Sequence, residues 1–192
     1  MNKIDVFRTE IRYVKNARLM DNLKKMIELL PDYFFMIPAS STGKYHPSFA
    51  LGEGGLVRHT KAAVRFAKEL LDNECIGNVF NSDEKDMIIM ALIMHDGCKS
   101  GLIKGEYTVA NHPSIVASLI KDNSSKLTLE ESEINLICSM IESHMGPYNK
   151  DFKGNTILPL PYNKYQKFVH MCDLLASKKF LDIKFNNNEI VE

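Results

Sequence analysis

Residues 82–99 of the chain read SDEKDMIIMALIMHDGCK. Ser82 is a preferred N-cap residue, and the acidic side chains that follow it suit the positive end of a helix dipole. Met87 to Met94 is apolar on every side, which is typical of a helix buried at the centre of a protein. This predicted helix runs directly into His95 and Asp96, a polar pair whose burial costs several kcal/mol unless partners satisfy it. The segment therefore predicts a core helix with a candidate site at its end.

Helical periodicity continues on both sides of this segment. Apolar residues recur at steps of three and four, which predicts further helices over residues 4–15, 19–30, 56–73, 113–121, 129–145 and 164–184. The intervening segments 31–51 and 147–161 predict ordered loops, the second able to form a short hairpin. We find no repeat and no confident pair of strands, and residues 185–192 are expected to fray. We therefore predict one all-α domain over residues 1–192, a bundle of roughly six to eight helices.

The composition narrows the class of protein. Lys and Arg (24) balance Asp and Glu (24) in 192 residues, which argues against stable binding of duplex nucleic acid, since phosphate contacts need a basic excess. The N-terminus has no apolar signal segment, and the longest apolar run is far shorter than the ~20 residues that span a bilayer. The cysteines are too far apart for a paired zinc or redox motif, so reduced thiols are expected. We predict a cytoplasmic protein with no membrane partner, and the sequence assigns no oligomeric state.

Three familiar functional motifs are incomplete or absent in this sequence. Thr42-Gly43-Lys44 lacks the earlier glycine and the following Ser or Thr of a phosphate-binding loop. Gly52-Glu53-Gly54 has no predicted strand before it and carries Val57 where a dinucleotide fingerprint needs its third glycine. No G-x-S-x-G elbow of a serine hydrolase is present. These three classes of site are therefore set aside.

The histidines are the candidates for metal ligation: His46, His59, His95, His112, His144 and His170. A single histidine is more often a surface or satisfied core residue than a ligand, so the context decides. His95 and Asp96 diverge by about 100° on a helix and can approach one ion from neighbouring sides. The end of the helix also favours a cation. Imidazole and carboxylate ligands suit Mn, Fe, Co, Ni or Zn better than Mg or Ca, so we predict a transition-metal site.

The order of His59, His95-Asp96 and Asp173 resembles the HD superfamily of metal-dependent phosphohydrolases. GGLVRHT (54–60) surrounds His59, HDGCK (95–99) matches the family's H-D-x-x-K, and MCDLLA (171–176) matches its late aspartate on a helix. The resemblance covers about residues 52–176 and implies that these four residues hold a metal ion. It also implies that His112 and His144 extend the site to two ions. Residues 38–60 resemble, more loosely, the HD part of some 3′-to-5′ exoribonucleases, whereas the G-Y-P segment of cyclic-di-GMP phosphodiesterases is absent.

Asp96 and Lys99 are the expected catalytic residues. Asp96 can bridge two ions because a carboxylate has two oxygens, and two ions about 3.5–4 Å apart can clamp a phosphoryl group during in-line displacement. Lys99 can offer positive charge to the developing anion, although a lysine that only stabilises the helix end is the alternative. His170 is expected to support the site or simply to pack, and Cys98 to pack. Substrate contacts are expected from Lys44, His46, Glu53, Ser177 and Lys178.

These observations lead to two hypotheses about function. The first is a hydrolase that cleaves a phosphoester, using one or two divalent transition-metal ions and a metal-activated water. Its substrate would be a small phosphorylated molecule, a nucleotide or short oligonucleotide. The second is a non-catalytic HD-type module that binds a nucleotide or a partner. The complete ligand set and Lys99 favour the hydrolase, since degenerate copies tend to lose those residues.

Overall fold

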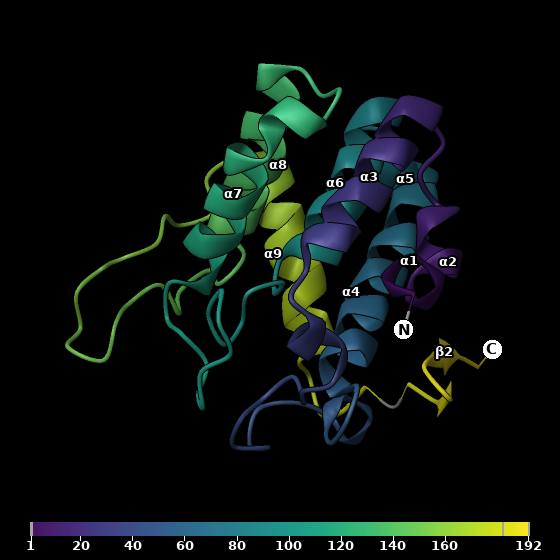
Figure 1. The fold of residues 1–192 in the computed structure, drawn as a ribbon. Helices are drawn as coiled ribbons and strands as arrows, with labels where there is room; N and C mark the ends of the chain where they lie inside the picture. The colour runs from purple at the N-terminus through teal and green to yellow at the C-terminus, as the bar shows by residue number, and fades with distance from the viewer. Residues whose placement is uncertain (1, 182, 192) are drawn as a thin grey trace.

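The computed structural model describes residues 2–181 and 183–191, and this part of the chain is mostly helical (Figure 1). Six helices of eleven residues or more build the bundle: α3 (Ala17–Leu29), α4 (Gly55–Asp72), α6 (Ser82–Met94), α7 (His112–Asp122), α8 (Glu131–Ser143) and α9 (Lys164–Ala176). Three single-turn helices accompany them: α1 (Lys3–Val6), α2 (Arg8–Ile11) and α5 (Glu74–Gly77). The 3-10 turns are η1 (Asp32–Phe35), η2 (Ser48–Ala50) and η3 (Ser124–Lys126). The prediction of an all-α bundle is confirmed.

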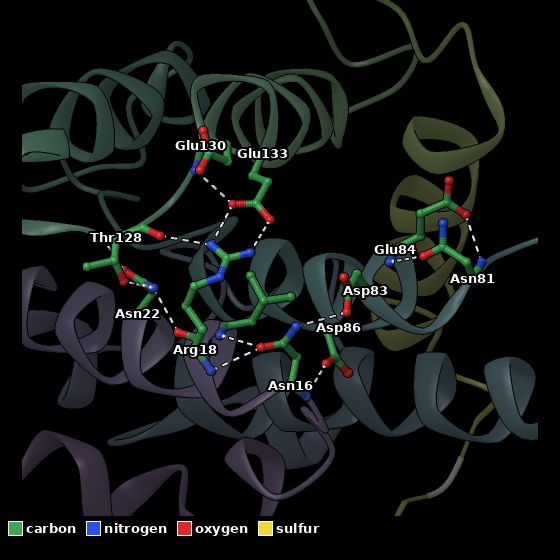
Figure 2. Close-up of polar contacts among 11 residues, drawn as sticks. Asn16, Arg18, Asn22, Asn81, Asp83, Glu84, Asp86, Thr128, Glu130 and Glu133 are labelled. Carbon is green, nitrogen blue, oxygen red and sulfur yellow. Dashed lines mark hydrogen bonds and ion pairs between the residues drawn. The ribbon is translucent and has the colours of Figure 1, made fainter.

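Helix α6 lies at the centre of the bundle, as its apolar sequence predicts. It packs against α3, α4, α8 and α9, and residues 86–94 are all buried. Its N-cap is Asn81 rather than the predicted Ser82, because Asn81 and Glu84 form a reciprocal capping box (Figure 2). The wholly apolar surface of α6 is therefore covered on several sides, and its end carries His95 and Asp96 into the interior.

The opposite end of the bundle is tied together by side chains from α3 and α8. Arg18 on α3 forms an ion pair with Glu133 on α8 and also donates a hydrogen bond to the carbonyl of Thr128. Asn22 accepts a hydrogen bond from the backbone N–H of Thr128 and donates one to its hydroxyl (Figure 2). These contacts fix α3 against the loop that leads into α8.

The first predicted helix is divided in the structure. Residues 4–15 form α1 and α2 rather than one helix, because Phe7 departs from helical geometry between them. Its buried ring packs against Phe34 and Phe35 of η1, with ring centroids 6.1 and 6.3 Å away. The aromatic cluster decides the conformation here, and local helical periodicity does not.

The C-terminal segment also corrects the prediction. The last helix ends at Ala176 instead of residue 184, and residues 185–190 form an antiparallel hairpin, β1 (Phe185–Asn186) with β2 (Glu189–Ile190), rather than a frayed tail. Contacts from remote parts of the chain hold this hairpin. Phe185 packs on Phe49 with ring centroids 5.1 Å apart, and Glu189 pairs with the fully buried Lys61 at 2.6 Å.

Four loops lie together at one end of the bundle, the lower end in Figure 1: those before α4, between α6 and α7, after α8 and after α9. There α4 and α7 begin and α6, α8 and α9 end, so the loops attached to these ends lie around a common area. Segment 31–51 is a loop with two 3-10 turns, and Lys150 and Thr156 form the bridge of a small hairpin, both as predicted. Within the described residues, no helix is long and apolar enough to cross a membrane.

Candidate metal centre

Six side chains from five helices converge at this end of the bundle. His59 lies near the start of α4, His95 and Asp96 directly follow α6, His112 begins α7, His144 follows α8, and Asp173 lies near the end of α9. The four histidines and Asp96 are buried almost completely, and the side chain of Asp173 is 17% exposed. These are the six residues that the sequence analysis selected as metal ligands, brought together from positions 114 residues apart in the chain.

One group of ligand atoms consists of His59, His95 and Asp173. The Nε2 atom of His59 is 2.9 Å from Oδ1 of Asp173, and the Nε2 atom of His95 is 3.5 Å from the same oxygen. One ligand atom from each of these residues lies within 4.8 Å of the others, which is close enough for one ion to contact all three. The group supplies two imidazoles and one carboxylate, a donor set suited to a divalent transition metal.

A second group lies on the other side of Asp96. His95, Asp96 and His144 also have ligand atoms within 4.8 Å of one another. Oδ1 of Asp96 is 2.8 Å from Nε2 of His112 and 3.5 Å from Nε2 of His144. Oδ2 of Asp96 faces the other way, 3.5 Å from Nε2 of His95 and 3.8 Å from Nε2 of His59. The two oxygens of Asp96 thus face two different sets of histidines.

Backbone carbonyls orient three of the imidazoles. The Nδ1 atom of His95 lies 2.6 Å from the carbonyl of Leu92. His112 and Val109 form the same contact at 2.8 Å, as do His144 and Ile141 at 2.7 Å. A carbonyl oxygen can only accept, so each Nδ1 carries the proton and donates it. In the neutral ring the lone pair is then on Nε2, which points into the cluster, and this is how metal-binding histidines are commonly held.

Several polar atoms of the cluster are buried without a hydrogen-bond partner. These atoms include Nε2 of His95, Nε2 of His112 and Oδ1 of Asp96. His112 and Asp96 approach to 2.8 Å, yet the two atoms are not aligned as a hydrogen bond. Buried polar atoms are rarely left unsatisfied, because each costs about 1–3 kcal/mol. Lone pairs that face one another in this way fit a bound cation, so the residues present suit a metal ion.

Burial and nearby charge act in opposite directions on the pKa values in the cluster. Burial raises the pKa of Asp96, but the Lys99 ammonium and His95 outweigh it and hold the pKa well below the usual value. The pKa of Asp173 is likewise held well below its usual value by His59 and His95, against the effect of burial. Burial lowers the pKa of His59 and His144, which favours neutral imidazoles. The pKa of His95 is raised, because the two carboxylates outweigh the effect of its burial.

Lys99 is part of the cluster rather than a solvated lysine at a helix end. Its ammonium group is 2.5 Å from Oδ2 of Asp96, and the residue is 9% exposed. The turn that carries Lys99 is fixed by Tyr33 of η1, which donates a hydrogen bond to the carbonyl of Gly101 and accepts one from the N–H of Ser100. Burial raises the pKa of Tyr33 to about 12, so its hydroxyl remains a donor.

The structure brings only one of the other predicted substrate residues to the cluster. The ring of His46 packs edge-on against His59 with centroids 4.8 Å apart, and burial lowers its pKa to about 3, with further lowering from His59 and Lys99. Lys44 and Glu53 are exposed. The Ser177 hydroxyl donates to the carbonyl of Leu174. Ser177 reaches the cluster only through its backbone N–H, which donates to the carbonyl of Asp173, and among the described residues no hydrogen bond or ion pair joins the side chains of Lys44, Glu53, Ser177 or Lys178 to those of the cluster.

Arg58 fixes the loop that carries His46. Its guanidinium donates hydrogen bonds to the carbonyls of Phe49, Leu51 and Glu53, at 2.5, 2.8 and 2.9 Å. A further bond of 2.9 Å reaches the side chain of Asn188 in the C-terminal hairpin. In the sequence Arg58 is only the residue before His59. Its role in holding the loop could not be predicted, because most of its partners are backbone carbonyls. The three carbonyls that hold the histidines were likewise not predicted from the sequence. Each carbonyl lies three residues before its histidine, but no residue type marks it, so the sequence carries no signal for the contact.

Two neighbours of the ligands have the structural roles expected of them. His170 donates from Nδ1 to the backbone carbonyl of His144 at 2.6 Å, which supports a residue of the cluster without joining it. Cys98 is fully buried and packs in the core.

The two buried groups of His and Asp residues, which share His95, can hold a metal ion. No family model, no curated protein and no solved structure matches the chain.

Proposed function

We propose that the chain is a metal-dependent phosphohydrolase of the HD superfamily that cleaves a phosphoester. The observation that carries this proposal is the convergence of histidine Nε2 atoms, each left free by an Nδ1–H bond to the backbone, around the two oxygens of Asp96. Such a donor set suits Mn, Fe, Co, Ni or Zn. One or two such ions are the cofactors, with Asp96 facing both groups of ligands.

A bound divalent ion would supply Lewis acidity and a water of lowered pKa. The residues of the chain hold the ion, exclude water and keep the site organised. His59, His95 and Asp173 hold one position, while His112 and His144 face Oδ1 of Asp96 at the other. The core around them excludes bulk water, which strengthens every charge interaction inside. Rigid ligands on helix ends also keep the site organised before substrate arrives.

Lys99 is the residue that most directly favours catalysis over simple metal binding. Lys99 and Asp173 have the most exposed side chains of the cluster, at 11% and 17%, so we place the approach of substrate on the side of Lys99. A phosphate approaching from that side meets the positive charge first. We assign Lys99 to stabilising negative charge on the phosphoryl group, and Asp96 to holding metal.

The substrate in this proposal is a nucleotide or a short oligonucleotide. The side chains of the cluster are at most 17% exposed, so a phosphate group must project into the centre from a molecule that remains largely outside. Of the substrate residues predicted from the sequence, His46 is supported by its packing against His59. Lys44, Ser177 and Lys178 remain predictions.

The test combines metal analysis with a substrate screen. Purified chain loaded with Mn or Fe should bind close to two equivalents and hydrolyse at least one member of a panel of phosphomonoesters and phosphodiesters. Lys99→Ala should keep its metal but lose about 10²–10³-fold in turnover, whereas the matched control Lys126→Ala, an exposed lysine at the far end of the bundle, should not change. Full metal without hydrolysis of any ester would instead favour a non-catalytic binding module.

A further inference from the structure

The loops around the candidate metal centre carry an unusual surface. We define the rim as residues 39–54, 97–111, 145–158 and 177–181, the segments attached to the helix ends that carry the cluster residues. Figure 1 shows the segments before α4, between α6 and α7, and after α8 at the same end of the bundle. The rim contains seven lysines and three acidic residues, although the whole chain is neutral. Positive charge is therefore concentrated around the entrance to the centre.

Exposed aromatic rings are concentrated in the same place. Six Phe and Tyr residues are largely exposed among the described residues, and five of them lie in the rim near the centre: Tyr45, Tyr107, Tyr148, Phe152 and Phe180. They are between 63% and 95% exposed. The sixth, Tyr162, adjoins the start of α9 at the opposite end of the bundle. Aromatic rings in contact with water are unfavourable, so a cluster of them marks a binding surface.

Lysines adjoin these rings in the sequence. Lys44 precedes Tyr45, Lys153 follows Phe152, and Lys179 precedes Phe180. Lys150 is two residues after Tyr148, and Lys104 three before Tyr107. Each rim segment thus presents at least one flat apolar ring beside a positive charge. This combination matches the chemistry of a single-stranded nucleic acid, whose bases stack on aromatic rings while its phosphates pair with lysines.

We propose that the rim binds single-stranded nucleic acid and directs one phosphodiester toward the centre. This inference rests on the proposed function for what happens to the strand, but the binding surface stands on its own residues. A single strand fits better than a duplex, because the rings need unpaired bases and the net charge of the chain is zero. A strand fits better than a mononucleotide, because the rings belong to four separate segments and can engage several bases at once.

The test measures binding to the full chain in EDTA, which prevents hydrolysis of the probe, with the folded state checked by circular dichroism. The probe is a fluorescein-labelled ten-nucleotide strand, as DNA and as RNA, followed by fluorescence anisotropy. It should bind at least about tenfold more tightly than the same strand in a duplex or than a labelled mononucleotide. Its affinity should fall with added salt, in proportion to the phosphates contacted.

Two double variants locate the surface. Tyr107→Ala with Phe152→Ala should weaken binding by about 10- to 100-fold, as expected when stacked bases lose their rings. Lys104→Glu with Lys153→Glu should weaken binding and flatten its salt dependence. The matched controls are Tyr162→Ala, an equally exposed ring at the far end, and Lys126→Glu, and both should bind like wild type. All replaced side chains are exposed, so the variants should fold.

Three outcomes would overturn the proposal. The first is a strand that binds no more tightly than the mononucleotide, and the second is equal binding by the rim variants and the controls. Alternatively, vesicles containing an anionic lipid could compete with the strand and lose affinity in the rim variants while the strand does not, which would assign the rim to a membrane surface. A chain that hydrolyses small phosphoesters but fails these binding tests refutes only the rim. A chain that binds the strand but hydrolyses nothing refutes only the proposed reaction.

Discussion

Two buried aspartates, ten residues apart, show how differently α6 uses its two ends. Asp86 in the first half of the helix is 2% exposed and Asp96 just beyond its end is 1% exposed. The carboxylate of Asp86 accepts hydrogen bonds of 2.7–3.0 Å from the backbone N–H groups of Lys15 and Asn16, and Figure 2 shows the contact with Asn16. Asp96 instead faces Lys99 and several imidazoles, and its Oδ1 atom has no hydrogen bond.

The difference lies in the groups that compensate each charge. Burial raises the pKa of Asp86 and the two backbone N–H groups are the main opposing cause, so neutral dipoles do most of the compensation of this carboxylate. Around Asp96, the charges of Lys99 and His95 overcome the effect of burial and hold the pKa well below its usual value. Burial therefore does not distinguish a functional carboxylate from a structural one. Unsatisfied lone pairs that face other potential ligands do distinguish it.

The largest effect is expected from removing the carboxylate of Asp96. Asp96→Ala takes away the oxygens that face both groups of histidines, so metal content should fall well below that of wild type. Turnover should fall by about 10³-fold or more, since losing even one electrostatic contact costs about 10²–10³. Metal analysis and the phosphoester assay measure both. Asp83→Ala, which removes an exposed carboxylate of α6, is the control. An Asp96→Ala protein with full metal and full turnover would show that the centre is assigned wrongly.

Removing the carboxylate of Asp86 should affect stability instead. Asp86→Ala leaves the N–H groups of Lys15 and Asn16 without an acceptor in a partly buried place. Each such loss costs about 1–3 kcal/mol, so the free energy of unfolding should fall by about 2–5 kcal/mol in urea titrations. Metal content per folded chain should stay as in wild type. Loss of metal together with unchanged stability would contradict the comparison.

A third prediction concerns how much a bound metal ion raises the melting temperature. A ligand present at about 100 times its dissociation constant stabilises the folded state by about 2.7 kcal/mol. At roughly 2–4 °C per kcal/mol for a chain of this size, EDTA should lower the melting temperature by about 5–10 °C. Asp86→Ala should keep this shift, although it starts from a lower melting temperature, and Asp96→Ala should lose most of it. An identical melting curve with and without EDTA in wild type would place the ion outside the packed interior.

The smallest effect concerns cysteines beside the site. Cys98 precedes Lys99 and Cys172 precedes Asp173, yet both cysteines are buried, as is Cys138. Burial raises the pKa of Cys98 to about 11 and of Cys138 to about 12, so little reactive thiolate forms at pH 8. A thiol reagent at pH 8 should therefore modify one residue in the native chain, the exposed Cys75, and four after unfolding. Rapid reaction of two or more native thiols would show that these cysteines belong to the accessible site.

The sequence predicts those features that depend on residue type at a fixed spacing. The apolar run 87–94 identifies the central helix, and the pattern of His59, His95-Asp96 and Asp173 selects side chains that do converge. It does not predict contacts made to the backbone or across long separations. The carbonyl of Val109 that holds His112 carries no sequence signature. The hairpin at 185–190 depends on Lys61 and Phe49, which lie far away in the chain.

The long separation between His59 and Asp173 also bears on how the protein folds. Their contact closes a loop of 114 residues. The entropy cost of such a closure grows only slowly with length, but contacts of high sequence separation form late and slow the folding reaction. During synthesis, α4 and α6 emerge well before α9, so the group of His59, His95 and Asp173 cannot form until α9 has been made. Acquisition of an ion by the group of His59, His95 and Asp173 would therefore report that the last helix has docked.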